Sequence, residues 1–179
     1  MAQAATIYAF AVELADIDRG VYETLSVRVA RQASETPAFM LTRLLAFCLE
    51  HTEGIVLTEG VAAGSEPAVL VRDLTGRITA WIEVGMPDAE RVHRGSRQAS
   101  RVAVYTHRAV PHVLAQLEGR HVFRAPAIPV FAFGDGFVDE VSATLERRSS
   151  VALSLTERQL YLDVDGRTFT TEVTEHHFD

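Results

Sequence analysis

The sequence predicts an α/β fold in which helices flank a central mixed β-sheet, within one domain that covers residues 1–179. Segments with the alternating pattern of β-strands and segments with the apolar spacing of helices follow one another along the chain. The chain has 179 residues, 47% of them hydrophobic and 23% charged, which suits a soluble domain with a substantial core. No internal repeat, linker or low-complexity segment divides it.

The first third of the chain is expected to form a β-hairpin followed by a helix. Residues 5–14 and 22–31 alternate between apolar and polar side chains and are rich in β-formers, with a turn at residues 16–20. Residues 34–37, Ser-Glu-Thr-Pro, then begin a helix, because Ser or Thr caps a helix N-terminus and Pro suits its first turn. The apolar spacing continues this helix to about His51.

The middle third is expected to form a second hairpin, a helix and a strand. Residues 68–72 and 78–84 are strand segments on either side of a turn at residues 73–77. A helix follows over residues 88–97, and the apolar residues 101–105 predict another strand.

The last third is expected to add two helices and four strands. The helices span residues 110–118 and 139–145, and the strands are formed by residues 128–133, 150–156, 159–164 and 167–173. His176 and His177 are expected to lie in a disordered tail.

The basic residues of this chain are unusual in kind. All 17 are arginine, so mechanisms that need a lysine, such as Schiff-base formation or a P-loop, are excluded. Asp and Glu number 24, which gives a net charge of -7. A basic coat for nucleic acid is therefore absent, but a local basic patch is compatible with this charge.

The remaining composition excludes several other kinds of site. The single cysteine, Cys48, excludes an internal disulfide and a cysteine-rich zinc site, and its apolar neighbours predict a buried thiol. The histidines lack zinc-motif spacing, and no serine has the context of a hydrolase nucleophile. Because the chain lacks a long apolar run and a signal-peptide pattern, we expect a cytoplasmic protein without a membrane partner.

Two glutamates are expected to converge at one end of the second hairpin. If the turn centres near Thr75, two residues lie opposite one another in the antiparallel pair when their numbers sum to about 150. Glu83 then lies across from Pro67, next to Glu66. Two adjacent carboxylates repel each other, and Mg²⁺ is a natural counterion for them. The alternative is that Glu66 begins a loop and that Glu83 ends a strand and faces solvent.

Arginines follow on the next predicted helix. Arg91 and Arg94 are three residues apart and therefore share one helix face, a spacing that suits bidentate contacts with phosphate groups. The alternative is a solvated helix face on which these arginines pair with Asp88 and Glu90.

Several segments together form a more specific pattern. These are residues 81–88 (Trp-Ile-Glu-Val-Gly-Met-Pro-Asp), residues 34–36, Glu66-Pro67, Arg91 and Gln98-Ala99. The set resembles the YaeQ family of bacterial proteins over essentially the whole chain, and that family is similar to the PD-(D/E)XK nuclease superfamily. The resemblance implies a restriction-endonuclease-like core, a central mixed sheet flanked by helices, with added N- and C-terminal strands.

The resemblance also implies a Mg²⁺ site with named residues. Glu35 would be the acid of the first helix, Glu66 would take the Asp position of the motif, and Glu83 would be its E-x-K acid. Glu66 and Glu83 would hold the metal. Gln98 would match a glutamine that some branches of the superfamily place on the following helix.

The chain departs from the nuclease motif at two positions. Its Glu66 precedes a proline, whereas the motif has an Asp after a proline, and Gly85 stands where the motif has lysine. Arg91 or Arg94 could supply the missing charge from the next helix. An arginine cannot serve as a general base at neutral pH, so a metal-bound hydroxide would have to be the nucleophile.

Two functions follow from these residues. The first is Mg²⁺-dependent hydrolysis of phosphodiester bonds in DNA or RNA around Glu35, Glu66 and Glu83. The alternative is an inactive nuclease-like scaffold that binds nucleic acid, or a protein partner in transcription or repair, with Arg91 and Arg94 contacting phosphates. A protein-interaction module that never meets nucleic acid is a third reading, and the net charge of -7 favours it slightly.

Overall fold

The computed structural model describes residues 4–59 and 64–179, and these form four α-helices, one 3₁₀-helix and ten β-strands. The first half of the chain contains β1 (Thr6–Asp16), β2 (Val21–Arg31), α1 (Pro37–Leu49), β3 (Ile55–Leu57), β4 (Val69–Arg72) and β5 (Ile78–Val84). The second half contains α2 (Ala89–Gln98), β6 (Arg101–Thr106), α3 (Val110–Leu117), η2 (Ala125–Ala127), β7 (Val130–Phe133), α4 (Phe137–Ser142), β8 (Arg148–Thr156), β9 (Gln159–Val164) and β10 (Arg167–His176).

All ten strands belong to one sheet with the order β2-β1-β8-β9-β10-β7-β6-β5-β4-β3. The pairs β1–β8, β5–β6 and β6–β7 are parallel and the other pairs are antiparallel. The predicted mixed α/β fold is therefore confirmed. The N- and C-terminal strands are part of this same sheet.

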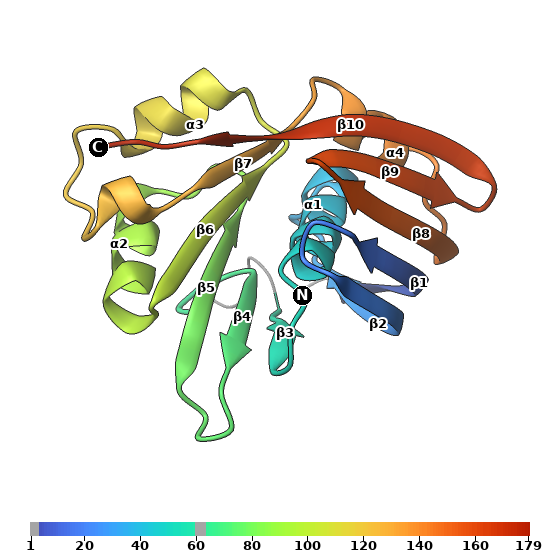
Figure 1. Cartoon of the computed structure of the whole chain (residues 1–179), viewed down its shortest axis with the longest axis horizontal. Coiled ribbons are helices and arrows are strands. Elements are labelled where there is room, and N and C mark those ends of the chain that lie inside the picture. Colours follow the sequence, from blue (N-terminus) through green and yellow to red (C-terminus); the bar gives the residue numbers. More distant parts are fainter. Residues whose placement is uncertain (1–3, 60–63) are drawn as a thin grey trace.

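Strand β10 joins the two halves of the sheet. Residues 167–172 pair with β9, and residues 173–176 pair with β7. Figure 1 shows this long strand arching from one half of the molecule to the other. The expected disordered tail is wrong at His176, because that residue pairs with Val130 of β7.

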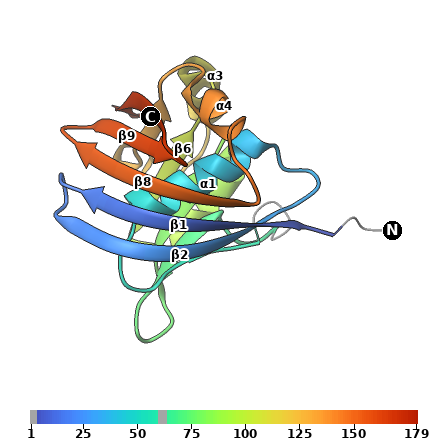
Figure 2. The same ribbon diagram turned by 90° about the vertical axis from the view of Figure 1, so that its right-hand side faces the viewer.

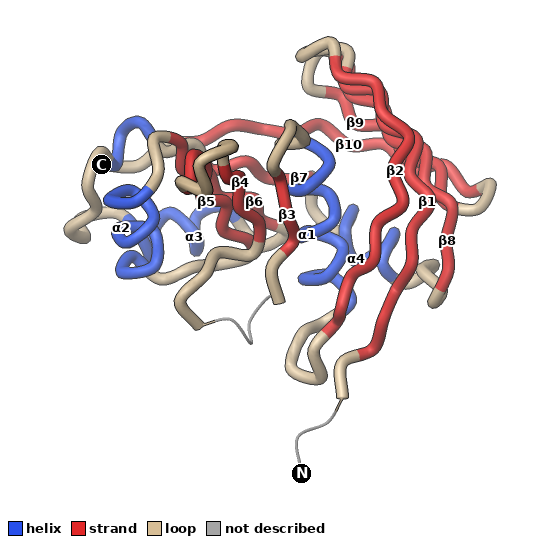
Figure 3. The backbone as a smooth tube through the Cα atoms, turned by 90° about the horizontal axis from the view of Figure 1, so that it is seen from below, coloured by secondary structure: helices blue, strands red, loops and turns tan. Residues whose placement is uncertain are grey.

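Helix α1 lies inside the curve of the sheet, with strands on several sides of it (Figures 2 and 3). The Thr36 hydroxyl caps its N-terminus by accepting the Phe39 N–H at 3.1 Å, and Pro37 is its first residue, as the sequence predicts. Ten of its thirteen residues are buried, because the sheet wraps around the helix. The main hydrophobic core is this contact between α1 and the inner face of the sheet.

A second, smaller core lies on the other face of β5, β6 and β7. There α2 and α3 cover the strands, and Trp81, Val92, Val113 and Leu117 pack together. None of the helices that the structure describes is long and apolar enough to cross a membrane.

Candidate functional site

Glu83 lies near the end of β5, within one residue of the register that the sequence predicts. Val69 of β4 lies opposite Ile82, one residue from the expected pairing, so Glu83 is level with the start of β4 and close in sequence to Glu66. The carboxylate is buried, with 3% of the residue exposed. The solvent-facing alternative for Glu83 is therefore wrong.

Both carboxylate oxygens of Glu83 have hydrogen-bond partners. Trp81 Nε1 donates to Oε1 at 2.8 Å, and Arg91 Nε donates to Oε2 at 3.3 Å. Burial raises the pKa of Glu83, while the charge of Arg91 and the hydrogen bond from Trp81 act in the opposite direction. Removal from water therefore outweighs the two partners, and the ionised form of Glu83 is held at a net cost.

Arg91 connects Glu83 with the segment that contains Glu66. Its Nη2 donates to the backbone carbonyl of Glu66 at 2.7 Å, and its Nη1 donates to the carbonyl of Gly64 at 3.3 Å. Asp88 caps α2 by accepting the Arg91 N–H at 2.9 Å, which fixes the first turn of this helix beside β5. One guanidinium thus bridges the two segments that the hairpin register brings together.

The absence of a side chain at residue 85 has a structural reason. Gly85 has φ +83°, a left-handed conformation that favours glycine, and an added Cβ would lie 3.1 Å from the Phe39 ring. A lysine at this position would require both backbone strain and displacement of Phe39. The cation beside Glu83 comes instead from Arg91 on the next helix.

Contact between α2 and β5 sets the position of Arg91. A Cβ on Gly95 would lie only 2.4 Å from Trp81 Cδ1, so glycine allows the helix to sit directly on the indole ring. The same Trp81 donates its N–H to Glu83. Gly95, Trp81, Glu83 and Arg91 therefore form one packed unit, which we call the Trp81 unit.

Glu35 lies at a different place, just before α1. It forms a fully buried ion pair with Arg43, whose Nη1 is 2.9 Å from Glu35 Oε2. Pro37 is the first helical residue and Thr36 its cap, so Glu35 lies directly before the start of the first helix. Arg43 also donates to Ala30 O of β2 and to Thr58 O just after β3, so it bridges the two end strands of the sheet.

Glu66 lines a cavity of about 410 Å³ together with Arg28, Arg43 and Arg72, whereas Glu83 lines another cavity of about 240 Å³. Among the described residues, no group of three or more His, Cys, Asp or Glu side chains is arranged to hold a metal ion. With its oxygens engaged by Trp81 and Arg91, Glu83 does not fit a Mg²⁺ ion shared with Glu66 in this conformation.

The other two predicted residues of α2 lie away from Glu83. Gln98 is exposed at the end of the helix, about 10 Å along the axis from Arg91 at the rise of an α-helix. Arg94 pairs with Glu90 at 3.4 Å on the solvent side, which matches the solvated-face alternative.

Three features of the structure went unnoticed in the sequence. Asp88 lines the same 240 Å³ cavity as Glu83, although its position after Pro87 signals only a helix cap. The second feature is the exposed ring of Phe123. The guanidinium carbons of Arg97 and Arg124 lie over this ring, 5.0 and 5.1 Å from its centroid. No sequence signal pairs these residues, because 26 positions separate Phe123 from Arg97.

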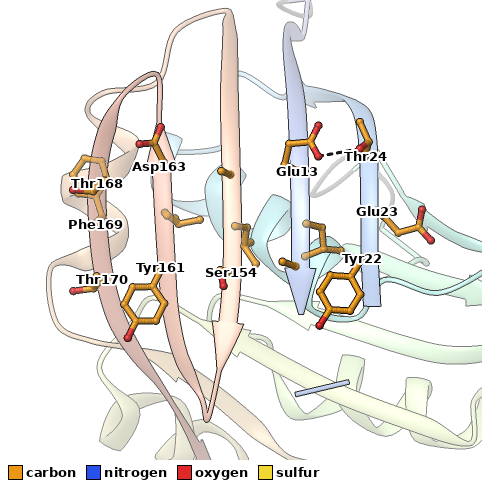
Figure 4. Close-up of a pocket in the computed structure, with 15 residues that line it drawn as sticks. Glu13, Tyr22, Glu23, Thr24, Ser154, Tyr161, Asp163, Thr168, Phe169 and Thr170 are labelled. Atoms are coloured by element: carbon orange, nitrogen blue, oxygen red, sulfur yellow. Dashed lines mark hydrogen bonds between the residues drawn. The ribbon is translucent and has the colours of Figure 1, made fainter. Parts of the chain in front are cut away.

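The third feature is a hollow of about 600 Å³ on the outer face of β1, β2, β8, β9 and β10. Figure 4 shows Tyr22 and Tyr161 on either side of Ser154, with Glu13 and Asp163 further along the strands. Small and polar side chains alternate with buried ones in these strands, which is the ordinary pattern of a sheet with one solvated face.

Comparison with known proteins places the chain in a family. The sequence pattern of the YaeQ protein family matches residues 1–173. The chain belongs to the YaeQ family. It is 30% identical over 175 residues to the uncharacterized protein YaeQ of Escherichia coli (strain K12), covering 97% of both chains, and 29% identical over 163 residues to that of Salmonella typhi, covering 90% of both.

Crystal structures of family members have the same fold. YaeQ of Pseudomonas syringae superposes with a TM-score of 0.87 at 24% identity, over 98% of this chain and 97% of that one. YaeQ of Xanthomonas axonopodis pv. citri superposes with a TM-score of 0.85 at 22% identity, over 98% and 99%.

Proposed function

We propose that this YaeQ family member is a divergent, non-cleaving relative of the PD-(D/E)XK nucleases that binds nucleic acid with an arginine-rich surface on α2 and the loop after α3. This surface, the α2 patch, consists of Arg94, Arg97, Phe123 and Arg124. The observation that carries the proposal is the exposed Phe123 ring with two guanidinium groups over it, at 5.0 and 5.1 Å.

The patch has the chemistry that phosphates and bases require. Guanidinium groups form bidentate hydrogen bonds with phosphate, and their planes, like aromatic rings, stack against bases. Arg124 is held in place because its Nη2 donates to the carbonyls of Ser96 and Ala99 at 3.2 and 2.9 Å. Arg94 is available for phosphate, because its exposed pair with Glu90 contributes less than about 1 kcal/mol.

The internal arginines support a binding role in place of cleavage. Arg91 occupies the Glu83 carboxylate, and Arg43 occupies that of Glu35, so two of the three acids expected around a metal already have a cation. A net charge of -7 opposes long-range attraction of nucleic acid, so binding should depend on the local patch and on low salt.

Fluorescence anisotropy with labelled single-stranded DNA, single-stranded RNA and duplex DNA tests this proposal. Arg97→Gln and Arg124→Gln should each weaken binding and reduce the slope of log affinity against log salt by about 0.7 on single strands. Phe123→Ala should weaken single-strand binding more than duplex binding. Arg167→Gln, at an exposed arginine that begins β10, is the matched control and should leave binding unchanged. Equal affinity for all four variants would contradict the proposal.

Mg²⁺-dependent phosphodiester hydrolysis is the second candidate, and one observation favours it. Glu83 and Asp88 line the same cavity, so two carboxylates would face a metal there if Arg91 moved away from Glu83. Calorimetry with Mn²⁺ on the wild-type protein and on Arg91→Ala tests this candidate, together with a DNA and RNA cleavage assay. Metal-dependent cleavage that Glu83→Gln abolishes would establish it and overturn the non-cleaving proposal.

A protein partner in transcription or repair remains the alternative ligand for the same scaffold. In that case the wild-type protein and the α2 patch variants should all bind DNA and RNA only at background level in the anisotropy experiments.

A further inference from the structure

A cavity of about 450 Å³ lies where the two halves of the sheet meet, beyond the C-terminal end of α1. The β1–β2 turn, the end of α1, strand β6 and the β8–β9 turn all contribute to its wall. Five charged residues line it: Asp16, Arg19, Glu50, Arg101 and Arg158. This cavity is separate from the Glu83 cavity, which lies near the opposite end of α1 beside Phe39.

Both carboxylates in the cavity have arginine partners. Asp16 Oδ2 accepts from Arg19 Nε at 2.6 Å, and Arg19 also donates to the carbonyls of Cys48 and His51 at the end of α1. Glu50 forms a two-point pair with Arg101, at 2.8 and 2.7 Å, and accepts the Tyr105 hydroxyl at 2.7 Å. The negative charges of this cavity are therefore matched by two of its three arginines.

Arg158 is the third arginine and has no acidic partner within 4 Å among the described residues. Its guanidinium carbon lies 5.0 Å from the centroid of the Phe131 ring. A ring below the guanidinium plane engages the face of the cation and leaves its in-plane N–H donors unsatisfied. Consistent with this, Nη2 is buried and has no hydrogen-bond partner in the part of the chain that the structure describes.

The backbone holds Arg158 in this position against its own preference. Glu157 and Arg158 have φ +49° and +63°, a left-handed pair that hairpins ordinarily fill with Asn-Gly. The Asp18 carboxylate accepts the N–H groups of both residues, at 2.6 and 3.0 Å, and so maintains the turn. Non-glycine residues held in such conformations cluster at functional sites.

We propose that the cavity binds a small anion through an oxyanion group, carboxylate or phosphate, that accepts hydrogen bonds from Arg158. Two acids and three arginines line the cavity, so its lining residues carry one positive charge in excess, and Glu175, which acts on Arg101, lies outside this lining. An oxyanion in the cavity would supply both an acceptor for the guanidinium of Arg158 and the negative charge that the two acids do not provide. The hydroxyl-bearing Thr52 also lines the cavity and can donate to another oxygen of the anion, whereas the Thr79 hydroxyl already donates to the carbonyl of Val71 at 3.3 Å. Its volume of about 450 Å³ exceeds that of an inorganic ion and leaves room for a small organic acid or phosphate ester.

Thermal unfolding at constant ionic strength tests the site, with inorganic phosphate and acetate as separate probes and sodium chloride as the balance. One or both probes should raise the Tm of the wild-type protein in a saturable manner, because a ligand that binds only the folded state stabilises it. The probe that acts at lower concentration identifies the group. Arg158→Gln should weaken binding at least tenfold, and Arg167→Gln, the exposed control, should behave as wild type.

Two further variants keep the test decisive if Arg158→Gln does not fold. Arg158→Lys retains the charge but loses the planar pair of donors that can bind an oxyanion at two points, so it should bind more weakly than wild type and still respond. Glu50→Gln removes one negative charge and frees Arg101, so its Tm should rise more with the anion than that of wild type. No saturable shift in wild type, or an equal shift in Arg158→Gln, would overturn the proposal. Nucleic-acid binding by the α2 patch should be unaffected by Arg158→Gln, which separates the two proposals.

Discussion

Gly95→Ala tests whether the contact of α2 with Trp81 holds the Trp81 unit together. Two effects of this substitution oppose each other. Alanine is favoured over glycine in a helix by about 1 kcal/mol, so helix propensity alone predicts a more stable protein. Packing predicts the reverse, because the new Cβ would lie 2.4 to 2.7 Å from three atoms of the Trp81 indole.

The geometry decides which effect is larger. An ordinary contact needs 3.4 Å or more, so α2 or the indole must move by about 1 Å, and Trp81 is only 1% exposed. Overpacking of a buried site costs about 1–3 kcal/mol, and the rigid ring places this case near the upper limit. After subtraction of the propensity gain, we expect the free energy of unfolding to fall by about 2 kcal/mol.

Urea denaturation followed by tryptophan fluorescence measures this change directly, because Trp81 is the only tryptophan of the chain. With a slope of about 2 kcal/mol per molar urea, the midpoint should fall by about 1 M. In a Trp81→Leu background, followed by circular dichroism, Gly95→Ala should cost much less, since the ring that it strikes is gone. A Gly95→Ala protein as stable as wild type would refute the reasoning.

Three further predictions concern buried groups. The pKa of Glu83 is raised above its ordinary value of 4.5, so its contribution to stability is fully present below that pH and is lost as the pH rises through the folded-state pKa. The free energy of unfolding of Glu83→Gln should therefore improve relative to wild type between pH 4 and pH 8, and an unchanged difference in urea titrations would contradict the burial argument. Arg91→Gln leaves the Glu83 carboxylate without its cation and should lower the free energy of unfolding by about 3 kcal/mol at pH 7.5. This loss should shrink as the pH is lowered, because protonation of Glu83 removes the need for a cation; a loss that does not change with pH would point to packing alone. Burial raises the pKa of the Cys48 thiol to about 12, so a thiol reagent should label the native protein at pH 8 only at the rate of unfolding, which labelling with and without urea measures; rapid native labelling would exclude a buried thiol.

The sequence was sufficient for features that depend on neighbours along the chain. The Thr36 cap and Pro37 determine where α1 begins, because capping needs only the hydroxyl and the backbone three residues later. The turn between β4 and β5 sets the pairing of Val69 with Ile82, so the burial of Glu83 near the Glu66 segment follows from local register. Strand β3 was not predicted, because an alternating apolar and polar pattern cannot be recognised over only three residues.

Only the tertiary structure decided which charges meet. The sequence does not distinguish Arg91 from Arg94, because both lie on the same face of the predicted helix. In the structure, Gly95 packs against Trp81, Arg91 pairs with Glu83, and Arg94 pairs with Glu90. Glu35 faces Arg43 because the sheet wraps α1 and brings its two end strands together, a contact that no sequence period encodes. Because the chain has no lysine, the sequence alone showed that no lysine can stand beside Glu83. Side chains distant in sequence pair according to the packing of whole elements, and this packing determined that Arg91 is the arginine beside Glu83.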